Sequence, residues 1–359
     1  RVLNPTHERI DDMLLAETPH RCKVMPFSAG AAYNHGGITG AVELALLPPV
    51  HLHGLWLRPD ADSGRVRVRL HIRNSLQESV TAALTCTIAL ETAAHVPCDL
   101  PNAVEKALPP GDSEVEVWLQ VKAPKLWDLA TPVLYRVTAR LQSRGLNEEI
   151  SARCGFRDFR FADGAFRLNG RRLFLRSAHT ANHFPIGLQF PHDPDLARRD
   201  LVNAKAMGFN MVRFICGGAT PEQLDLCDEL GLMVYEESYA SWVPMADTPQ
   251  LGERFDRSVG EVIARDRNHP SVVIWGLLNE APDGPVFQHA VASLPLVRYL
   301  DDSRLVMLNS GRWDGHREIG SLANPDSLTW EPSLGMEGMS ASDVRNVPPQ
   351  TALGYTGGA

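Results

Sequence analysis

One segment, Asp266 to Glu280, constrains the fold of this chain more than any other. It reads D-R-N-H-P-S-V-V-I-W-G-L-L-N-E, and an apolar run extends from Val272 to Leu278 with Gly276 as its single interruption. An apolar run of this length between breaking residues is typical of a strand that is buried on both faces. Such strands belong to parallel α/β folds, in which helices or other elements cover both sides of the sheet.

Two polar residues, Asn279 and Glu280, directly follow this run. In a parallel α/β barrel the working residues lie just past the carboxyl ends of the strands. An amide beside a carboxyl group at that place suits acid/base chemistry on a polyhydroxylated substrate. An alternative fits the same residues, because Asn-Glu-Ala-Pro can also begin a helix with the asparagine as its N-cap. The spacing alone leaves both interpretations open.

Composition narrows the range of partners. The chain has 359 residues, of which 44% are hydrophobic and 22% charged, which allows two or three domains with real cores. Its formal net charge of −8 disfavours nucleic acid and anionic membrane surfaces as partners. No apolar run approaches the roughly 20 residues that cross a bilayer. The sequence predicts no metal site and no cofactor, and a homo-oligomer is possible.

The six cysteines lie at positions 22, 86, 98, 154, 216 and 227, without C-x-x-C spacing. This pattern indicates neither a zinc site nor a dense disulfide framework, so we expect mostly reduced, buried thiols. Cys86 and Cys98 fall in one predicted domain and remain a possible pair. The chain begins at Arg1 rather than Met and ends in a loop-like Gly-Tyr-Thr-Gly-Gly-Ala, so we expect a fragment, and its cellular compartment stays open.

Two patterns of secondary structure follow one another. Alternating apolar and polar residues predict half-buried strands at 66–72, 81–90, 114–121 and 134–141, which together favour an all-β sandwich. Residues 41–47 predict one earlier strand. After Phe156 the pattern changes to strands at 172–176, 211–214, 232–235, 272–278 and 305–308, with helices at 195–207, 220–231, about 250–265 and about 285–300 between them.

The alternation of strands and helices after Phe156 predicts parallel β/α units. Residues 343–347 are a further possible strand, which makes six where a closed barrel needs eight. An open doubly wound sheet can stop at six strands. However, no Gly-rich phosphate loop follows the first strand, which weakens that nucleotide-binding alternative.

Several separated segments, in order, resemble glycoside hydrolase family 2, the family of β-galactosidases, β-glucuronidases and β-mannosidases. Residues 266–280 are similar to the acid/base signature of the family. Further resemblance is carried by Y-N-H-G-G-I-T-G, K-L-W-D-L-A-T-P-V-L-Y, D-G-A-F-R-L-N-G-R-R-L-F-L-R, G-F-N-M-V-R and L-C-D-E-L-G-L-M-V-Y-E-E. The resemblance implies the end of a sugar-binding β jelly roll at 1–50 and an immunoglobulin-like β-sandwich at 51–155. It also implies an incomplete (β/α)8 TIM barrel at 156–359, truncated before its seventh strand.

The family resemblance implies a retaining mechanism with two glutamates and a terminal β-linked sugar as the substrate. Glu280 matches the acid/base, and Asn279 matches the residue that bonds the sugar 2-hydroxyl. The family nucleophile lies in a segment like S/T-E-[YF]-G, which this chain lacks. Glu331 and Glu337 come too early, so we expect the nucleophile beyond Ala359. This fragment alone should therefore be inactive.

Further site residues follow from the ends of the predicted strands. Arg213 is placed to keep a nearby nucleophile ionised, and Glu237 to contact substrate or to support Arg213. His179 and His183 come after the first strand, within reach of sugar hydroxyls. Tyr239 and Trp242 are candidate platforms on which a sugar ring stacks. Each also has an ordinary structural explanation, as an ion pair, a solvated loop residue or a core aromatic.

The chain departs from the family pattern where the family grips its sugar. The family often has N-R-H-E, R-x-S-H and D-E-A-N after its first three strands, whereas this chain has H-T-A-N, R-F-I-C and E-E-S-Y. A β-galactosidase-type substrate is therefore not assumed. Two other hypotheses remain: a carbohydrate-binding relative without catalysis, and an endo-acting glycosidase of the same clan. The β domains ahead of the barrel argue against the endo-acting enzyme.

Overall fold

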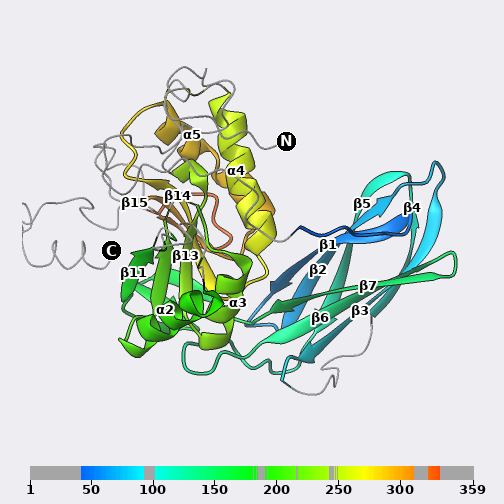
Figure 1. Cartoon of the computed structure of the whole chain (residues 1–359), viewed down its shortest axis with the longest axis horizontal. Coiled ribbons are helices and arrows are strands. Elements are labelled where there is room, and N and C mark those ends of the chain that lie inside the picture. Colours follow the sequence, from blue (N-terminus) through cyan, green and yellow to red (C-terminus); the bar gives the residue numbers. More distant parts are fainter. Residues whose placement is uncertain are drawn as a thin grey trace, which may run out of the picture.

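The computed structural model describes residues 42–92, 102–180, 182, 184, 191, 193–215, 217–241, 246, 248, 250–310 and 322–331. Within them an antiparallel β-sandwich is followed by a parallel sheet with helices packed along its outer face (Figure 1). Residues 1–41, and with them most of the expected jelly-roll remainder, lie outside the described part, as does the expected strand at 343–347.

The sandwich has seven strands in two sheets. One sheet has the order β1-β2-β5, and the other has the order β4-β3-β6-β7. The strands are β1 (Val50–Pro59), β2 (Arg65–Asn74), β3 (Val80–Leu90), β4 (Asn102–Leu108), β5 (Gly111–Gln120), β6 (Tyr135–Ser143) and β7 (Leu146–Cys154). All of their pairings are antiparallel.

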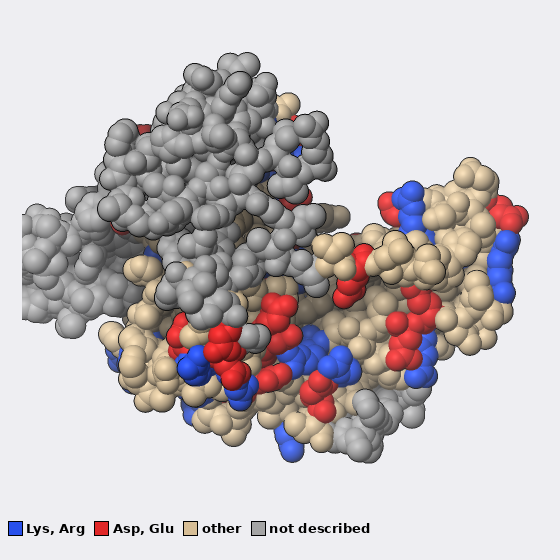
Figure 2. Space-filling view, in the orientation of Figure 1, with Lys and Arg blue, Asp and Glu red and all other residues tan. Residues whose placement is uncertain are grey.

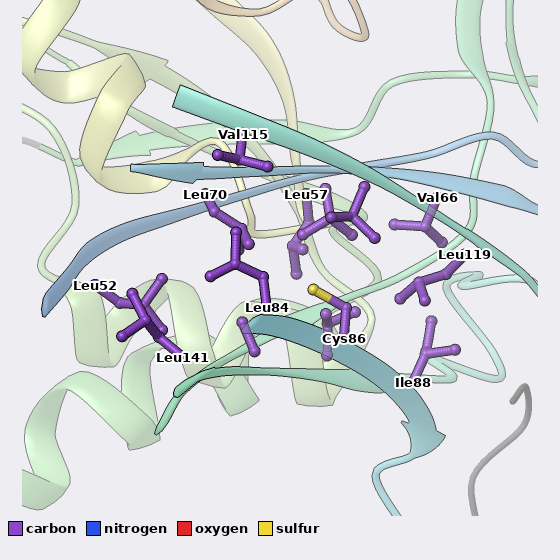
Figure 3. Close-up of a cluster of buried hydrophobic side chains, with 14 of the residues drawn as sticks. Leu52, Leu57, Val66, Leu70, Leu84, Cys86, Ile88, Val115, Leu119 and Leu141 are labelled. Atoms are coloured by element: carbon purple, nitrogen blue, oxygen red, sulfur yellow. The ribbon is translucent and has the colours of Figure 1, made fainter. Parts of the chain in front are cut away.

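Period-two alternation buries one face of each sandwich sheet, as the sequence predicts. In β2, Val66, Val68, Leu70 and Ile72 are fully buried, while the arginines between them are only partly covered. These side chains meet those of the opposite sheet, including Leu84 and Ile88, in one core (Figure 3). The predicted strand at 41–47 is wrong for the described residues 42–47, which form no regular structure. Leu44 and Leu46 are more than 90% exposed, and no described strand lies beside them.

A small antiparallel sheet separates the sandwich from the parallel sheet. Its strands are β8 (Phe159–Ala162), β9 (Ala165–Leu168) and β10 (Arg171–Leu173). Asp163-Gly164 and Asn169-Gly170 connect them, and all four residues have positive φ, as two-residue hairpin turns require. The prediction of residues 172–176 as the first parallel strand is therefore wrong, because the Asn-Gly turn folds Arg171–Leu173 back into a hairpin.

The parallel sheet has the order β11-β12-β13-β14-β15-β16. Its strands are β11 (Ser177–Thr180), β12 (Met211–Phe214), β13 (Met233–Glu237), β14 (Val272–Asn279), β15 (Leu305–Ser310) and β16 (Leu322–Ala323). The first five are parallel, and β16 pairs antiparallel with β15. All eight residues of β14 are buried, which confirms the doubly buried strand that its apolar run predicts.

The helices that cover this sheet are α2 (Pro194–Ala206), α3 (Pro221–Leu230), α4 (Leu251–Asp266), α5 (Pro285–Ala292) and α6 (Leu294–Leu300), with a 3₁₀ turn, η1 (Tyr239–Ser241). The predicted start of α3 is confirmed: Thr220 and Gln223 form a capping box, and Gly231 ends the helix in the left-handed conformation. The predicted single helix at 285–300 is wrong. It is divided at Ser293, because Pro295 cannot continue a hydrogen-bonded helix and instead occupies the first turn of α6.

Charged side chains connect the sandwich to the base of the parallel sheet. Asp302 accepts hydrogen bonds from Arg58 (2.7 Å) and Arg67 (2.8 Å), both in the sandwich. The Arg157 guanidinium donates to the carbonyl oxygens of Pro270 (3.0 Å) and Val272 (2.8 Å), at the beginning of β14. Figure 2 shows acidic and basic side chains interspersed over both parts on one face of the molecule. The Arg157 contacts hold the start of β14 in place, opposite the end that carries the candidate site.

The described cysteines Cys86, Cys154 and Cys227 are free and buried, which confirms for these three the expected reduced, buried thiols. Burial raises the pKa of Cys86 to about 12. Its possible partner Cys98 lies outside the described residues. Among the described helices, none combines the length and the apolar character that a membrane crossing needs.

Candidate active site

Side chains of β12 and β13 alternate between the two faces of the parallel sheet. Val212 and Val234 pack toward the helices, whereas Met211, Met233 and Tyr235 pack on the opposite, inner face. Strand alternation therefore directs Arg213 and Glu237 to the inner face at the carboxyl end of the strands. In the register, Arg213 lies between His179 of β11 and Tyr235 of β13.

Arg213 and Glu237 form an ion pair. The Nη2 atom of Arg213 lies 2.5 Å from Oε1 of Glu237, and Nε donates to the same oxygen at 2.8 Å. The Glu237 side chain is fully buried. Burial alone lowers the pKa of Arg213, but its interactions with Tyr235 and Glu237 and the charge of Glu280 outweigh burial and raise that pKa above its ordinary value. A permanent cation therefore stands at the end of β12.

Asn279, the last residue of β14, is 4% exposed and is held by two donors. Arg213 Nη2 donates to its Oδ1 at 2.6 Å, and the Ser310 hydroxyl donates to the same oxygen at 2.9 Å. A guanidinium only donates, so the atom that faces it must be the amide oxygen. The Nδ2 group is therefore turned away from Arg213, and none of the described residues accepts a hydrogen bond from it.

Glu280 follows directly and is exposed at the same edge of the sheet. Its backbone has φ of 52° and its N–H donates to the Ser310 carbonyl at 3.0 Å. A left-handed backbone is uncommon for a glutamate and is held here by the surrounding structure. The helix N-cap alternative is wrong, because Asn279 ends a strand and the next helix, α5, is capped at Gly284.

Gly276 of β14 makes room for the buried part of the site. A Cβ atom at this position would lie 2.2 Å from Cε2 of Tyr235 and 2.6 Å from Cγ of Glu237. The Arg213 guanidinium in turn stacks over the Tyr235 ring, 4.9 Å from its centroid. The one interruption in the apolar run thus allows the side chains of β13 to lie against β14.

Glu236 and Glu237 are adjacent in sequence but lie on opposite faces of β13. Glu236 is buried on the helix side, where its Oε1 accepts the Ala219 N–H at 2.9 Å and lies 3.6 Å from Arg265. Burial first, and then the charge of Asp266, raise the pKa of Glu236 well above its ordinary value. Of this pair, only Glu237 belongs to the candidate site.

The remaining predicted site residues have different positions. His179 is exposed in β11 and is the register partner of Arg213. Tyr239 is 44% exposed in η1, which follows β13, and its ring lies 3.0 Å from the position of a Cβ on Gly217. Trp242 and His183 lie outside the described residues.

In the described part of the chain, Asp225, Asp228 and His269 have the spacing of a metal site. They lie near Ser271, at the beginning of β14 and not at its carboxyl end. Their atoms are already engaged: Asp228 accepts from Ser271 N–H at 2.9 Å and lies 2.6 Å from His269. Asp225 is paired with Arg153. We therefore interpret this cluster as an ion-pair network between α3 and the sandwich.

Two family models match consecutive parts of the chain. The model described as "Glycosyl hydrolases family 2" matches residues 50–157, which span the sandwich. The model described as "Glycosyl hydrolases family 2, TIM barrel domain" matches residues 159–337, which include every strand of the parallel sheet. The chain belongs to glycoside hydrolase family 2. Its sandwich and its β/α units are the immunoglobulin-like and TIM-barrel domains of that family.

Individual family 2 proteins agree with this assignment. A β-galactosidase of Aeromonas hydrophila is 32% identical over 291 residues, which are 77% of this chain and 28% of that protein. A putative β-glucuronidase of Formosa agariphila is 35% identical over 173 residues, which are 47% of this chain and 20% of that protein. The crystal structure of a Parabacteroides merdae β-glucuronidase matches with a TM-score of 0.62 and 26% identity, over 73% of this chain and 34% of that one. The chain thus spans about a third or less of the length of these family members.

One residue of the site, Ser310, is not among those predicted from the sequence. It ends β15 and contacts both Asn279 and Arg213, the latter at 2.6 Å. The signal that identified Asn279 was also present here, since Asn309 and Ser310 directly follow the apolar residues 305–308.

Proposed function

We propose that the protein to which this chain belongs is a retaining β-glycosidase in which Glu280 is the general acid/base. The observation that carries the proposal is the strand-end cluster of Arg213, Glu237, Asn279 and Ser310 beside the exposed Glu280, in a member of family 2. Its substrate would be a terminal sugar in β linkage. The relatives named above include a β-galactosidase and two β-glucuronidases, one of them putative, so we propose no single sugar as the substrate.

In this mechanism Glu280 gives a proton to the leaving oxygen and later removes one from the attacking water. Its exposure leaves the carboxyl group accessible to a substrate at the strand ends. Asn279 has its Oδ1 occupied by two donors, so it would bind a sugar hydroxyl by donating from Nδ2. This amide would therefore act as a donor only.

Arg213 would keep the second carboxylate of the reaction, the nucleophile, ionised. A retaining glycosidase needs a nucleophile about 5–5.5 Å from its acid/base. We assign this nucleophile to sequence beyond Ala359, since no segment of the chain resembles that of the family. A guanidinium buried beside Glu237 is fixed in orientation, and it would hold such a carboxylate ionised. His179, Tyr239 and Trp242 are proposed to line the sugar site.

The proposed domain organisation follows the same reasoning. Residues 1–50 would be the end of a sugar-binding jelly roll, 51–155 the sandwich, and 156–359 a barrel whose seventh and eighth strands come from later sequence. The length of the relatives supports further domains and strands in the whole protein, because the match covers only 28% of the A. hydrophila β-galactosidase.

The test is turnover of unactivated β-glycosides by the full-length protein and its Glu280→Gln variant. The variant keeps the size of the side chain but cannot transfer the proton, so turnover should fall about 10²–10⁴-fold. Glu261→Gln, an equal change on the exposed face of α4, is the control and should retain full turnover. Binding of sugar without any hydrolysis by the unmodified protein would instead support a carbohydrate-binding relative without catalysis.

A further inference from the structure

We propose that Ser310 is a positioning residue, whose hydroxyl fixes the Asn279 amide in the orientation that donates to the substrate. This inference rests on the proposed function and adds a residue that acts through Asn279 rather than on the sugar. The inference concerns the binding of a sugar hydroxyl by Asn279 and not the proton transfer by Glu280.

The contacts form a closed triangle at the end of three strands. The Arg213 guanidinium donates to Ser310 Oγ at 2.6 Å, and Ser310 Oγ donates to Asn279 Oδ1 at 2.9 Å. Arg213 also donates directly to Asn279 Oδ1 at 2.6 Å. An amide oxygen carries no proton, so in the contact between Ser310 Oγ and Asn279 Oδ1 the hydroxyl is the donor, while its lone pairs remain open to Arg213.

The triangle gives the asparagine a single orientation. If the amide were flipped, Nδ2 would face the guanidinium, which only donates, and the Ser310 hydroxyl would lose the oxygen that accepts its proton. With Ser310 present, two hydrogen bonds oppose such a flip, whereas without it only the bond from Arg213 does. Arg213 is also shared with Glu237, so it cannot adjust freely to compensate.

The main chain of Ser310 has a separate role, which a side-chain substitution leaves intact. Its carbonyl accepts the N–H of Glu280 at 3.0 Å, and Ser310 is the register partner of Asn279 across β14 and β15. Replacement of the hydroxyl alone should therefore keep Glu280 in place and remove the side-chain contacts with Asn279 and Arg213.

The experiment uses the full-length protein and compares kcat/KM for a nitrophenyl β-glycoside with kcat/KM for its 2-deoxy analogue. The analogue lacks the hydroxyl that Asn279 is proposed to bind. Ser310→Ala should lower kcat/KM for the parent glycoside about five- to tenfold, which corresponds to one lost hydrogen bond, and should change that for the 2-deoxy analogue less than about twofold. The quantity to compare is the ratio of kcat/KM for the parent glycoside to kcat/KM for the 2-deoxy analogue. Ser310→Thr, which keeps the hydroxyl, should restore this ratio to the value of the unmodified protein.

Two further variants separate positioning from general damage. Ser310→Cys keeps the approximate volume and offers only a weak donor, so it should lower the ratio in the same direction even if the alanine variant does not fold. Ser271→Ala is the matched control, since this buried hydroxyl at the start of β14 has no partner among the described residues; the ratio should not change.

Equal losses for both substrates in Ser310→Ala and Ser310→Cys, or no loss in either, would overturn the positioning role while leaving the glycosidase proposal intact. If the unmodified protein hydrolyses no β-glycoside, the proposed function fails first and the inference falls with it. A lowered ratio in the alanine and cysteine variants, with recovery in the threonine variant, supports Ser310 as the residue that orients Asn279.

Discussion

Arg213 and Glu237, on the neighbouring strands β12 and β13, pair at 2.5 Å, with the Glu237 side chain fully buried and the Arg213 side chain 18% exposed. The two side chains share a face because each lies two residues after another inner-face residue, Met211 and Tyr235 respectively. The pair connects the apolar interior of the sheet to its open edge, where Asn279 and Glu280 lie. It therefore couples the stability of the fold to the geometry of the site.

Removal of one partner should expose this coupling. Glu237→Gln leaves the guanidinium without its charged partner, and breaking a buried pair in this way costs about 3 kcal/mol or more. Urea denaturation should show a lower midpoint for the variant. Glu149→Gln, which removes the acid of the exposed pair with Arg140, should change the free energy of unfolding by less than about 1 kcal/mol. Equal effects of both substitutions would contradict the structural role of the buried pair.

Gly276 is expected to tolerate no side chain. In Gly276→Ala the new methyl group meets Tyr235 at 2.2 Å and Glu237 at 2.6 Å, and overpacking of this kind costs about 1–3 kcal/mol. Thermal unfolding should reveal the loss. Gly260→Ala, in the middle of α4, is the control: its nearest contact is Leu300 at 3.4 Å, so the better helix propensity of alanine should keep or raise stability. An unchanged unfolding temperature for Gly276→Ala would show that the ring and carboxylate are not packed as described.

The buried Glu236 predicts a dependence of stability on pH. Its pKa is raised in the folded protein, mainly by burial and next by Asp266, with Ala219 N–H and Arg265 acting against the shift. A raised carboxyl pKa stabilises the protonated folded state. That contribution is fully present below the unfolded pKa and is lost as pH rises through the folded one.

The test is the urea midpoint of the unmodified protein and of Glu236→Gln between pH 5 and pH 8. Glutamine is always neutral and can still accept from Ala219, so the variant should lose less stability than the unmodified protein as pH rises. Parallel curves for the two proteins over this range would rule out Glu236 as the source of the dependence.

Residues 1–359 alone should show no appreciable glycosidase activity. The proposed mechanism needs a second carboxylate, which we assign to later sequence, and a single acid cannot form and then hydrolyse a glycosyl intermediate. Purified protein of residues 1–359 and the full-length protein should be compared with the same nitrophenyl β-glycosides at equal concentrations. Hydrolysis by the shorter protein would place the nucleophile within the present chain.

Much of the fold was predictable because its signals are local. The apolar run of β14, the capping box at Thr220 and the left-handed Gly231 each depend on a few neighbouring residues. The first parallel strand was misplaced although its signal was also local: Asp163-Gly164 and Asn169-Gly170 are typical two-residue hairpin turns, and they determine that Arg171–Leu173 folds back.

The site was predictable in its members but not in its contacts. Polar residues at the ends of apolar strands, together with the family resemblance, identified Arg213, Glu237, Asn279 and Glu280. The pairing of Arg213 with Glu237 also requires the order of the strands and the face of each side chain, which no single segment encodes. Ser310 shows the same limit, since its importance comes from a hydrogen bond to a residue 31 positions earlier.

The most direct measurement concerns proton donation by Glu280. The full-length protein and its Glu280→Ala variant should be assayed with two β-glycosides of the same sugar, one with methanol and one with 2,4-dinitrophenol as the leaving group. Methanol needs a proton to leave, whereas dinitrophenolate does not. We expect a loss of about 10²–10⁴-fold for the methyl glycoside and a much smaller effect on the glycosylation step of the dinitrophenyl glycoside. Equal losses for both leaving groups, or none for either, would contradict the assignment of Glu280 as the acid.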